Sequence, residues 1–155
     1  MKKISALLLI LLTLTLLVGC KPQKITTTVC EGPVGRSGVT LKVTLKAKGD
    51  RVITSKQEGS FPLSLLYSNQ DMAEVRQDLK AKKYNSYKGV NYSFYIKNDQ
   101  IHETMKIDYE KGNLKELVQA KIARPNMNSS DDKQPSLKKL TKFYKNNYGF
   151  KCTTK

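Results

Sequence analysis

The side chains with the most distinct chemistry in this chain of 155 residues are its three cysteines, Cys20, Cys30 and Cys152. A thiol can act as a nucleophile, pair with a second thiol in a disulfide, or bind a metal ion as a thiolate. The residues around each cysteine indicate which of these chemistries it follows. The most informative surroundings are those on the amino-terminal side of Cys20.

Residues 1–20 indicate export and lipid attachment. Lys2 and Lys3 precede a leucine-rich apolar run that ends at Val18, a combination typical of a secretory signal. The run is shorter than the ~20 apolar residues that span a bilayer comfortably. The segment Leu17-Val18-Gly19-Cys20 resembles the bacterial lipobox, in which the cysteine thiol receives a diacylglyceryl group and a peptidase cuts before the cysteine. An ordinary cleaved signal and an uncleaved anchor are the alternatives.

This interpretation divides the chain into three parts. We expect a lipoprotein signal peptide over residues 1–19, a lipidated tether over residues 20–28 and a single domain over residues 29–155. The lipid on Cys20 would hold the mature chain on the extracytoplasmic face of the cell membrane, since two acyl chains give stable attachment. Cys30 and Cys152 remain as an even pair outside the cytoplasm, where disulfides persist. We predict that they form a disulfide, joining the first strand to the last.

The remaining candidates for catalysis do not form a recognisable set. His102 is the only histidine, so a Ser-His-Asp or Cys-His arrangement could be built only on this residue. A zinc site would need further nitrogen or sulfur ligands. Asp108 is expected to cap the turn after a strand. The pair Asp131-Asp132 lacks the spacing and the glycine of a calcium loop. We therefore expect no enzymatic activity, no cofactor and no metal, and an enzyme with a scattered site remains the alternative.

The composition is strongly basic, with 28 Lys+Arg against 13 Asp+Glu and a formal net charge of +15. Most of the cations are lysines, which are hydrated point charges and poor bidentate readers of bases or phosphates. Such a balance suits diffuse attraction to polyanions, such as anionic lipid headgroups, envelope polymers or nucleic acid. A surface that only keeps the protein soluble would give the same composition, so both interpretations stay open.

Two groups of lysines are the candidates for binding anions. At ~100° per residue, the lysines near the carboxyl end of the chain lie on the arc of a helix opposite its apolar residues. A second group shares the polar face of an alternating strand, and few acids are interspersed on either face to pair with the lysines. The helical lysines are Lys138, Lys139, Lys142 and Lys145, and the strand lysines are Lys42, Lys46 and Lys48.

The clearest structural pattern is the alternation of apolar and polar residues over residues 39–48. A period of two predicts a strand with one buried face and one solvated face. Gly49-Asp50 predicts a turn, residues 51–57 a second strand and residues 61–67 a third. A helix is expected to start at residues 68–71. Its apolar residues Met72, Val75 and Leu79 lie on one stripe.

A second hairpin follows the helix. Apolar residues alternate over residues 90–96 and again over residues 101–109, with a turn at Asn98-Asp99. Because the strands are joined by hairpins and not by βαβ crossovers, we predict an α+β fold. We expect an antiparallel sheet built from hairpins, with two or three helices packed on one face.

Two more helices and a strand are expected after this hairpin. Asn113 is typical of the residue that caps a helix, and it precedes a short apolar segment. Pro135 fits the first turn of a last helix, where its missing N–H group costs nothing. Gly149 is expected to end that helix. Residues 150–153 can form a short final strand.

From Val39 to Cys152, the chain resembles the YehR-like family of small bacterial lipoproteins of unknown function. The resemblance rests on short segments at turns and element ends. They are Lys48-Gly49-Asp50-Arg51-Val52, Gly89-Val90-Asn91-Tyr92, Ile107-Asp108-Tyr109-Glu110-Lys111 with Leu114, and Gly149-Phe150 after the closing helix. The resemblance implies an α+β fold and a lipoprotein, but it implies no reaction or ligand. It does not imply the disulfide for every relative.

These observations together predict a membrane-anchored, extracytoplasmic lipoprotein that is a non-catalytic binding or envelope-associated module. Its expected partners are the bilayer, through Cys20, and an anionic lipid or wall polymer; a protein partner is the further possibility. The alternatives are surface capture of polyanions or nucleic acid, with nucleic acid the less favoured, and an enzyme whose site is unrecognised.

Overall fold

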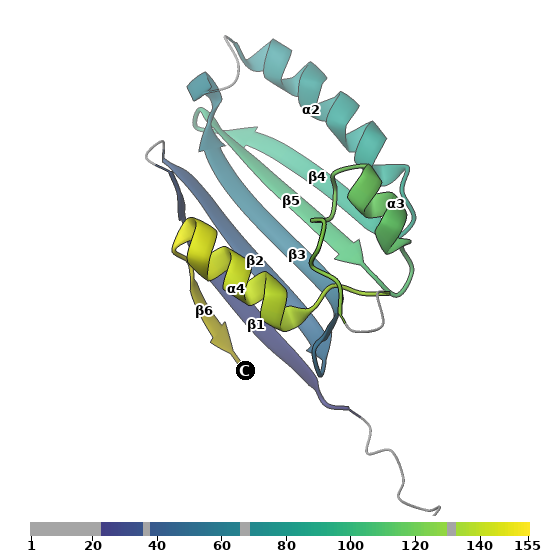
Figure 1. The fold of residues 1–155 in the computed structure, drawn as a ribbon. Coiled ribbons are helices and arrows are strands. Elements are labelled where there is room, and N and C mark those ends of the chain that lie inside the picture. The colour runs from purple at the N-terminus through teal and green to yellow at the C-terminus, as the bar shows by residue number, and fades with distance from the viewer. Residues whose placement is uncertain (1–22, 36–37, 66–68, 130–132) are drawn as a thin grey trace, which may run out of the picture.

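The computed structural model describes residues 23–35, 38–65, 69–129 and 133–155 (Figure 1). Cys20, the expected signal peptide and Asp131-Asp132 lie outside the described residues. The strands form a six-stranded antiparallel sheet in the order β4-β5-β3-β2-β1-β6. They are β1 (Ile25–Val34), β2 (Val39–Lys48), β3 (Arg51–Pro62), β4 (Val90–Lys97), β5 (Gln100–Asp108) and β6 (Lys151–Thr154). β1 begins inside the range expected for the tether.

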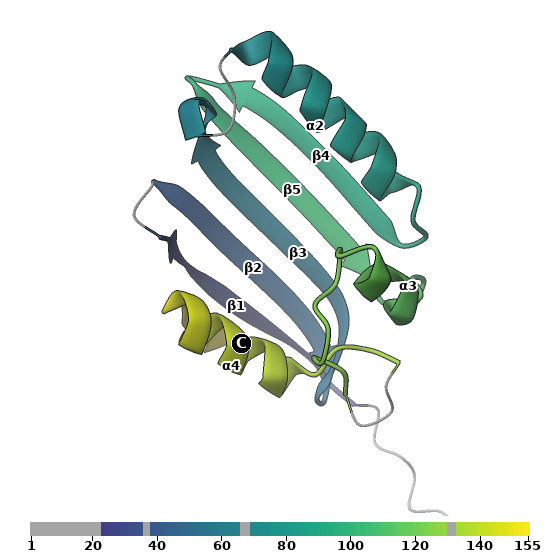
Figure 2. The ribbon, with the colours of Figure 1, turned by 45° about the horizontal axis from the view of Figure 1, so that its top comes forward.

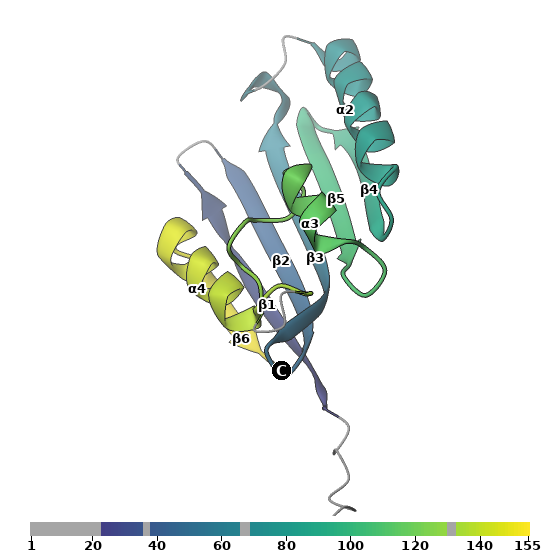
Figure 3. The ribbon, with the colours of Figure 1, turned by 45° about the vertical axis from the view of Figure 1, so that its right-hand side comes forward.

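Three α-helices pack on the same face of this sheet, which we call the inner face (Figures 1 and 3). They are α2 (Gln70–Asn85), α3 (Leu114–Gln119) and α4 (Leu137–Tyr148). α2 lies along β4, while α4 contacts β1 and β6. The predicted α+β fold, an antiparallel sheet with helices on one face, is confirmed. The opposite face of the sheet carries no α-helix among the described residues, and we call it the outer face.

β2 has the bounds that its alternation predicts. Val43, Leu45 and Ala47 are buried on the inner face, whereas Lys42 and Lys46 are exposed on the outer face. The pairing with β3 shifts between Lys46 and Ala47, as in a β-bulge. The predicted second hairpin is also confirmed, since β4 and β5 pair in register from Val90↔Ile107 to Lys97↔Gln100.

The prediction of a separate strand over residues 61–67 is wrong for residues 61–65, and residues 66–67 lie outside the described residues. β3 continues without a break to Pro62, and Leu63–Leu65 forms one turn of 3-10 helix. The middle of β3 is polar and contains Gly59, so its own sequence is a weak predictor of a strand. Its backbone is nevertheless paired with β2 on one side and with β5 on the other. Tertiary pairing therefore extends a strand that local propensity would end.

α2 begins where the sequence predicts, because the Asn69 side chain accepts a hydrogen bond from the amide of Met72 at 2.8 Å. Its apolar stripe, however, faces solvent. Met72 is 42% exposed, Val75 60% and Leu79 61%. The helix instead turns Ala73 and Gln77 toward the sheet, as its position beside β4 requires (Figure 2).

The contact between α2 and the sheet is polar and close. The hydroxyl of Tyr92 donates to Oε1 of the buried Gln77 at 2.7 Å, and the ring of Tyr84 meets that of Tyr92 edge-on. The side chain of Asn85 hydrogen-bonds both backbone groups of Tyr92, at 2.6 and 3.0 Å. The two bonds from Asn85 occupy backbone groups that an edge strand would otherwise offer to another chain.

α4 packs on the sheet through large apolar and aromatic side chains, in contrast to the polar contact of α2. Leu140 and Tyr144 are buried, and the ring of Tyr144 stacks on that of Phe150 with centroids 5.9 Å apart. The helix ends at Gly149, which has a φ of 68°, as predicted. Pro135 is not in the first turn, because the cap is Ser136. Pro135 lies just before the cap, and its carbonyl accepts a hydrogen bond from the amide of Val52 at 2.9 Å.

Cys30 and Cys152 form the predicted disulfide. They face each other directly in the β1–β6 register, with their Cα atoms 4.0 Å apart. β6 contains only four residues, so its backbone hydrogen bonds to β1 are few. The disulfide therefore fixes a short final strand at the edge of the sheet, beside the core.

Candidate binding surfaces

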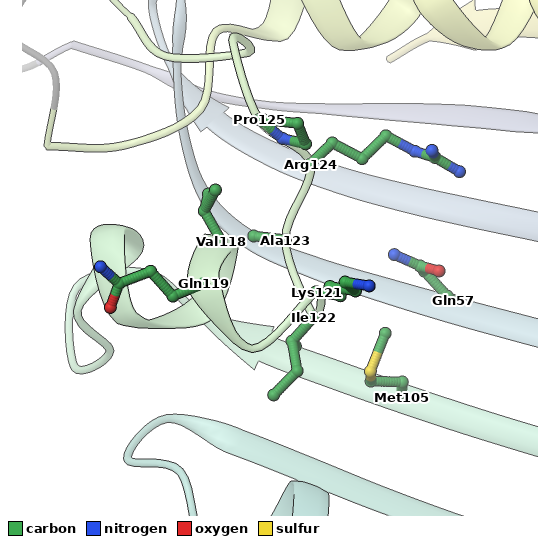
Figure 4. Close-up of a pocket in the computed structure, with 9 residues that line it drawn as sticks. All are labelled: Gln57, Met105, Val118, Gln119, Lys121, Ile122, Ala123, Arg124 and Pro125. Atoms are coloured by element: carbon green, nitrogen blue, oxygen red, sulfur yellow. The ribbon is translucent and has the colours of Figure 1, made fainter.

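The inner face carries a groove between the sheet and the segment after α3. Its volume is about 580 Å³, and Gln57 and Met105 on the strands face the loop that carries Ile122 and Arg124 (Figure 4). The guanidinium of Arg124 stacks on the ring of Phe143, 4.2 Å from its centroid. The residues lining the groove include no carboxylate, histidine, cysteine or hydroxyl group, and its ionisable side chains are the cations Lys121 and Arg124.

A smaller hollow of about 140 Å³ shares Met105 with this groove and extends toward α2. Here Lys80 forms an ion pair with Glu103, at 2.6 Å between Nζ and Oε1. The Lys80 ammonium also lies 5.0 Å from the centroid of the Tyr92 ring. Burial, and secondarily the negative charge of Glu103, raises the pKa of the Tyr84 hydroxyl. This shift favours the protonated form of the hydroxyl.

His102 and Asp108 are the two candidate catalytic side chains on β5, and each makes contacts that support the fold. His102 lies on the outer face and stacks on Tyr95, with ring centroids 4.6 Å apart. Asp108 accepts hydrogen bonds from the amides of Glu110 and Lys111, at 3.0 and 3.2 Å, which is the turn-capping role that the sequence predicts. The two residues are six positions apart on one strand, roughly 20 Å. The structure does not bring them together.

The strand lysines do not stand apart from acids as the sequence suggested. Lys42 pairs with Glu31 on β1 at 3.6 Å, and Lys48 pairs with Glu110 at 3.0 Å. The expected scarcity of nearby acids is wrong for these two, because the acids come from other parts of the chain. Lys46 forms no ion pair with any described residue. It borders a hollow whose other lysines come from β3, β5 and the turn after β5.

The helical lysines form the row that the sequence predicts, and we call Lys138, Lys139, Lys142 and Lys145 the α4 row. All four are exposed, and α4 contains no acidic residue. None of them forms an ion pair within the part of the chain that the structure describes. The α4 row and the strand lysines lie on opposite sides of the sheet, so one flat surface cannot contact both.

The chain matches a known protein family and is similar to two lipoproteins. Residues 33–151 match the family described as "Protein of unknown function (DUF1307)". The chain belongs to this family. It is similar to the uncharacterized lipoprotein Lmo0207 of Listeria monocytogenes, with 26% identity over 85% of this chain and 82% of the relative. It is also similar to the uncharacterized lipoprotein Lin0239 of Listeria innocua, with 27% identity over 97% and 95%.

Solved structures share the fold. The NMR structure of the Escherichia coli YehR protein aligns with a TM-score of 0.65 and 20% identity, over 86% of this chain and 94% of that one. A protein from Streptococcus pneumoniae aligns with a TM-score of 0.55 and 13% identity, over 88% of both chains. The predicted resemblance to the YehR-like family is confirmed. The relatives are named as lipoproteins, but neither their names nor the family description states a reaction or a ligand. No described helix is long and apolar enough to span a bilayer.

Proposed function

We propose that this protein is a lipoprotein held on the extracytoplasmic face of the cell membrane by a diacylglyceryl group on Cys20. On the membrane it is a non-catalytic binding module that contacts an anionic envelope surface through the α4 row. Two observations support the anchor: the lipobox-like segment that ends at Cys20, and relatives that are named as lipoproteins.

The α4 row is the observation that carries the binding proposal. Its four cations are exposed, belong to a helix without acids, and are not consumed in ion pairs with described residues. The helix is fixed to the sheet by Leu140 and Tyr144, so the lysines move as one unit. A lysine near an anionic membrane contributes about 1 kcal/mol, and a lipid anchor keeps the row near that surface. Four such contributions are enough to orient the protein.

Lysine footprinting on vesicles tests this orientation. The mature lipoprotein is reconstituted into vesicles of phosphatidylglycerol or of phosphatidylcholine, and each lysine is acetylated and quantified by mass spectrometry. We expect protection of the α4 row on the anionic vesicles only, while Lys42 on the opposite side of the sheet stays reactive. The protection should disappear at ~1 M salt, where the screening length falls to ~3 Å.

Charge reversal provides the matched comparison. Lys138→Glu, Lys142→Glu and Lys145→Glu together should abolish the preference for anionic vesicles. The control carries the same change in net charge at exposed positions elsewhere, through Lys82→Glu, Lys83→Glu and Lys97→Glu. If the α4 row is acetylated equally on both kinds of vesicle, the binding proposal is wrong.

The anchor is tested separately by Cys20→Ala. We expect this variant to accumulate as an unprocessed precursor that incorporates no labelled palmitate, because the only lipid-accepting thiol is gone. Incorporation of label at the wild-type level would exclude Cys20 as the lipidation site.

A further inference from the structure

Four lysines from different parts of the chain surround one hollow on the outer face, on the side of the sheet opposite the α4 row. The hollow has a volume of about 610 Å³. Three of the lysines come from β2, β3 and β5, and the fourth follows β5. They are Lys46, Lys56, Lys106 and Lys111, and we call this set the outer lysine site.

The strand register places two of these cations side by side. Lys56 on β3 is directly opposite Lys106 on β5, and Lys46 on β2 is opposite Thr54, two residues from Lys56. Side chains that are directly opposite have Cβ atoms about 5 Å apart, and like charges in that position destabilise a sheet. The pairing of Lys56 with Lys106 therefore does not itself stabilise the sheet.

Neighbouring acids compensate only part of this charge. Lys56 pairs with Glu58, and Lys111 pairs with Asp108 at 3.4 Å. Lys46 and Lys106 form no ion pair with the described residues. The carboxylate of Asp108 is further occupied by two backbone amides. The hollow therefore keeps an excess of positive charge that an anion would neutralise.

The remaining lining groups can donate hydrogen bonds to such an anion. Thr44 and Thr54 contribute hydroxyl groups, and Asn91, opposite Lys106 on β4, contributes an amide. Lysine binds phosphate as a point charge, and hydroxyl and amide donors complete the coordination of its oxygens. We propose that the outer lysine site binds a phosphate group, presented as a phosphomonoester or a phosphodiester. This goes beyond the function proposed for the α4 row, because it is a second anion site on the opposite face.

Calorimetry with inorganic pyrophosphate tests the site on the whole lipoprotein in neutral detergent micelles. We expect saturable binding of one pyrophosphate, weakened by added salt. Lys46→Gln and Lys106→Gln should each weaken it about three- to tenfold, since each removes a charge-assisted contact at an exposed site. The matched control is Lys42→Gln, which removes an outer-face lysine that lies outside the hollow and is already paired with Glu31. Absence of binding, or binding that both site variants leave unchanged, overturns the proposal.

Two arms distinguish the sources of phosphate. In the first, the lipoprotein is footprinted on phosphatidylglycerol vesicles, and protection of Lys106 by the membrane alone identifies a lipid headgroup. In the second, soluble pyrophosphate is added to the lipoprotein on phosphatidylcholine vesicles, and protection of Lys106 only then identifies a soluble or polymeric phosphate. Reversal of the α4 row to glutamate leaves pyrophosphate binding intact if the two sites are independent. Failure of one proposal is therefore distinguishable from failure of the other.

Discussion

The two faces of the sheet are built from the same strands but differ in how far their side chains are buried. On β5, Ile107 is 1% exposed beneath the helices, while its neighbour Lys106 is exposed on the outer face. Inner-face residues are held in place by packing, so their identity decides whether the chain folds. Outer-face residues contact solvent, and a set of charges that disfavours the sheet is tolerated there. The comparison indicates that the buried packing lies on the inner face, whereas the outer face presents its charges to solvent.

The disulfide gives the largest expected effect on the inner-face side. Cys30→Ser with Cys152→Ser should lower the free energy of unfolding by about 4–5 kcal/mol, because the closed loop spans a sequence separation of 122 residues. Urea unfolding with and without reductant measures the change, and reduction of the wild type should reproduce it. Titration of two free thiols in the native, unreduced protein would contradict the prediction.

A pair of adjacent substitutions compares the two faces directly. Ile107→Ala should cost about 2–5 kcal/mol, since it leaves a cavity under the helices. Lys106→Gln, one position away, should change the free energy of unfolding by less than about 1 kcal/mol. Both are read from urea unfolding curves with unchanged slopes. Equal losses at the two positions would show that the outer face also contributes to the core.

A buried tyrosine should make stability fall at high pH. Burial raises the pKa of Tyr109 to about 12, from the ordinary value of 10.0. The unfolded chain then releases this proton at a lower pH than the folded chain. The contribution of Tyr109 to the free energy of unfolding is therefore fully present below pH 10.0 and declines as the pH rises to about 12. The expected loss is about 1.4 kcal/mol per pH unit over that window.

Comparison of two variants isolates this loss from the titration of lysines. Tyr109→Phe should flatten the decline between pH 10 and pH 12, the window set by its pKa, whereas Tyr95→Phe, on the exposed outer face, should leave it as in the wild type. Urea unfolding at several alkaline pH values gives the slopes. An unchanged slope in Tyr109→Phe would exclude this tyrosine as the cause.

The smallest expected effect is a gain. Lys106→Gln should stabilise the ligand-free protein by about 0.2–1 kcal/mol at low salt, because it removes the repulsion of Lys56 directly opposite. Lys42→Gln should give no such gain, since Lys42 is paired with Glu31. The difference should shrink as salt screens the charges. A loss of stability in Lys106→Gln would show that the two lysines are not in conflict.

Several elements follow from the sequence because their signals are local. The alternation over Val39–Lys48 fixes a strand and its two faces, and Asn69 and Asn113 mark helix starts through bonds to amides two or three residues away. Gly149 marks a helix end because the αL conformation favours glycine. The disulfide also followed, since only two cysteines remained after Cys20 was assigned to the lipid.

The orientation of α2 did not follow from its sequence. The stripe of Met72, Val75 and Leu79 suggests a buried face, but the helix lies against Tyr92, whose hydroxyl needs a partner. The small Ala73 and the hydrogen-bonding Gln77 satisfy that contact, and larger apolar side chains would not. The side that a helix buries is set by the surface it meets, and that surface belongs to a strand formed later in the chain.

The sequence by itself determined which side chains share a face of each strand, because successive side chains alternate along any strand. It therefore placed Lys42, Lys46 and Lys48 together, as the structure does. Only the tertiary structure decided that Lys46 joins Lys56 and Lys106, since β3 pairs with β5 and not with the intervening β4. The register of such long-range pairs depends on how the inner face packs as a whole. For that reason no local pattern around any one lysine reveals the outer lysine site.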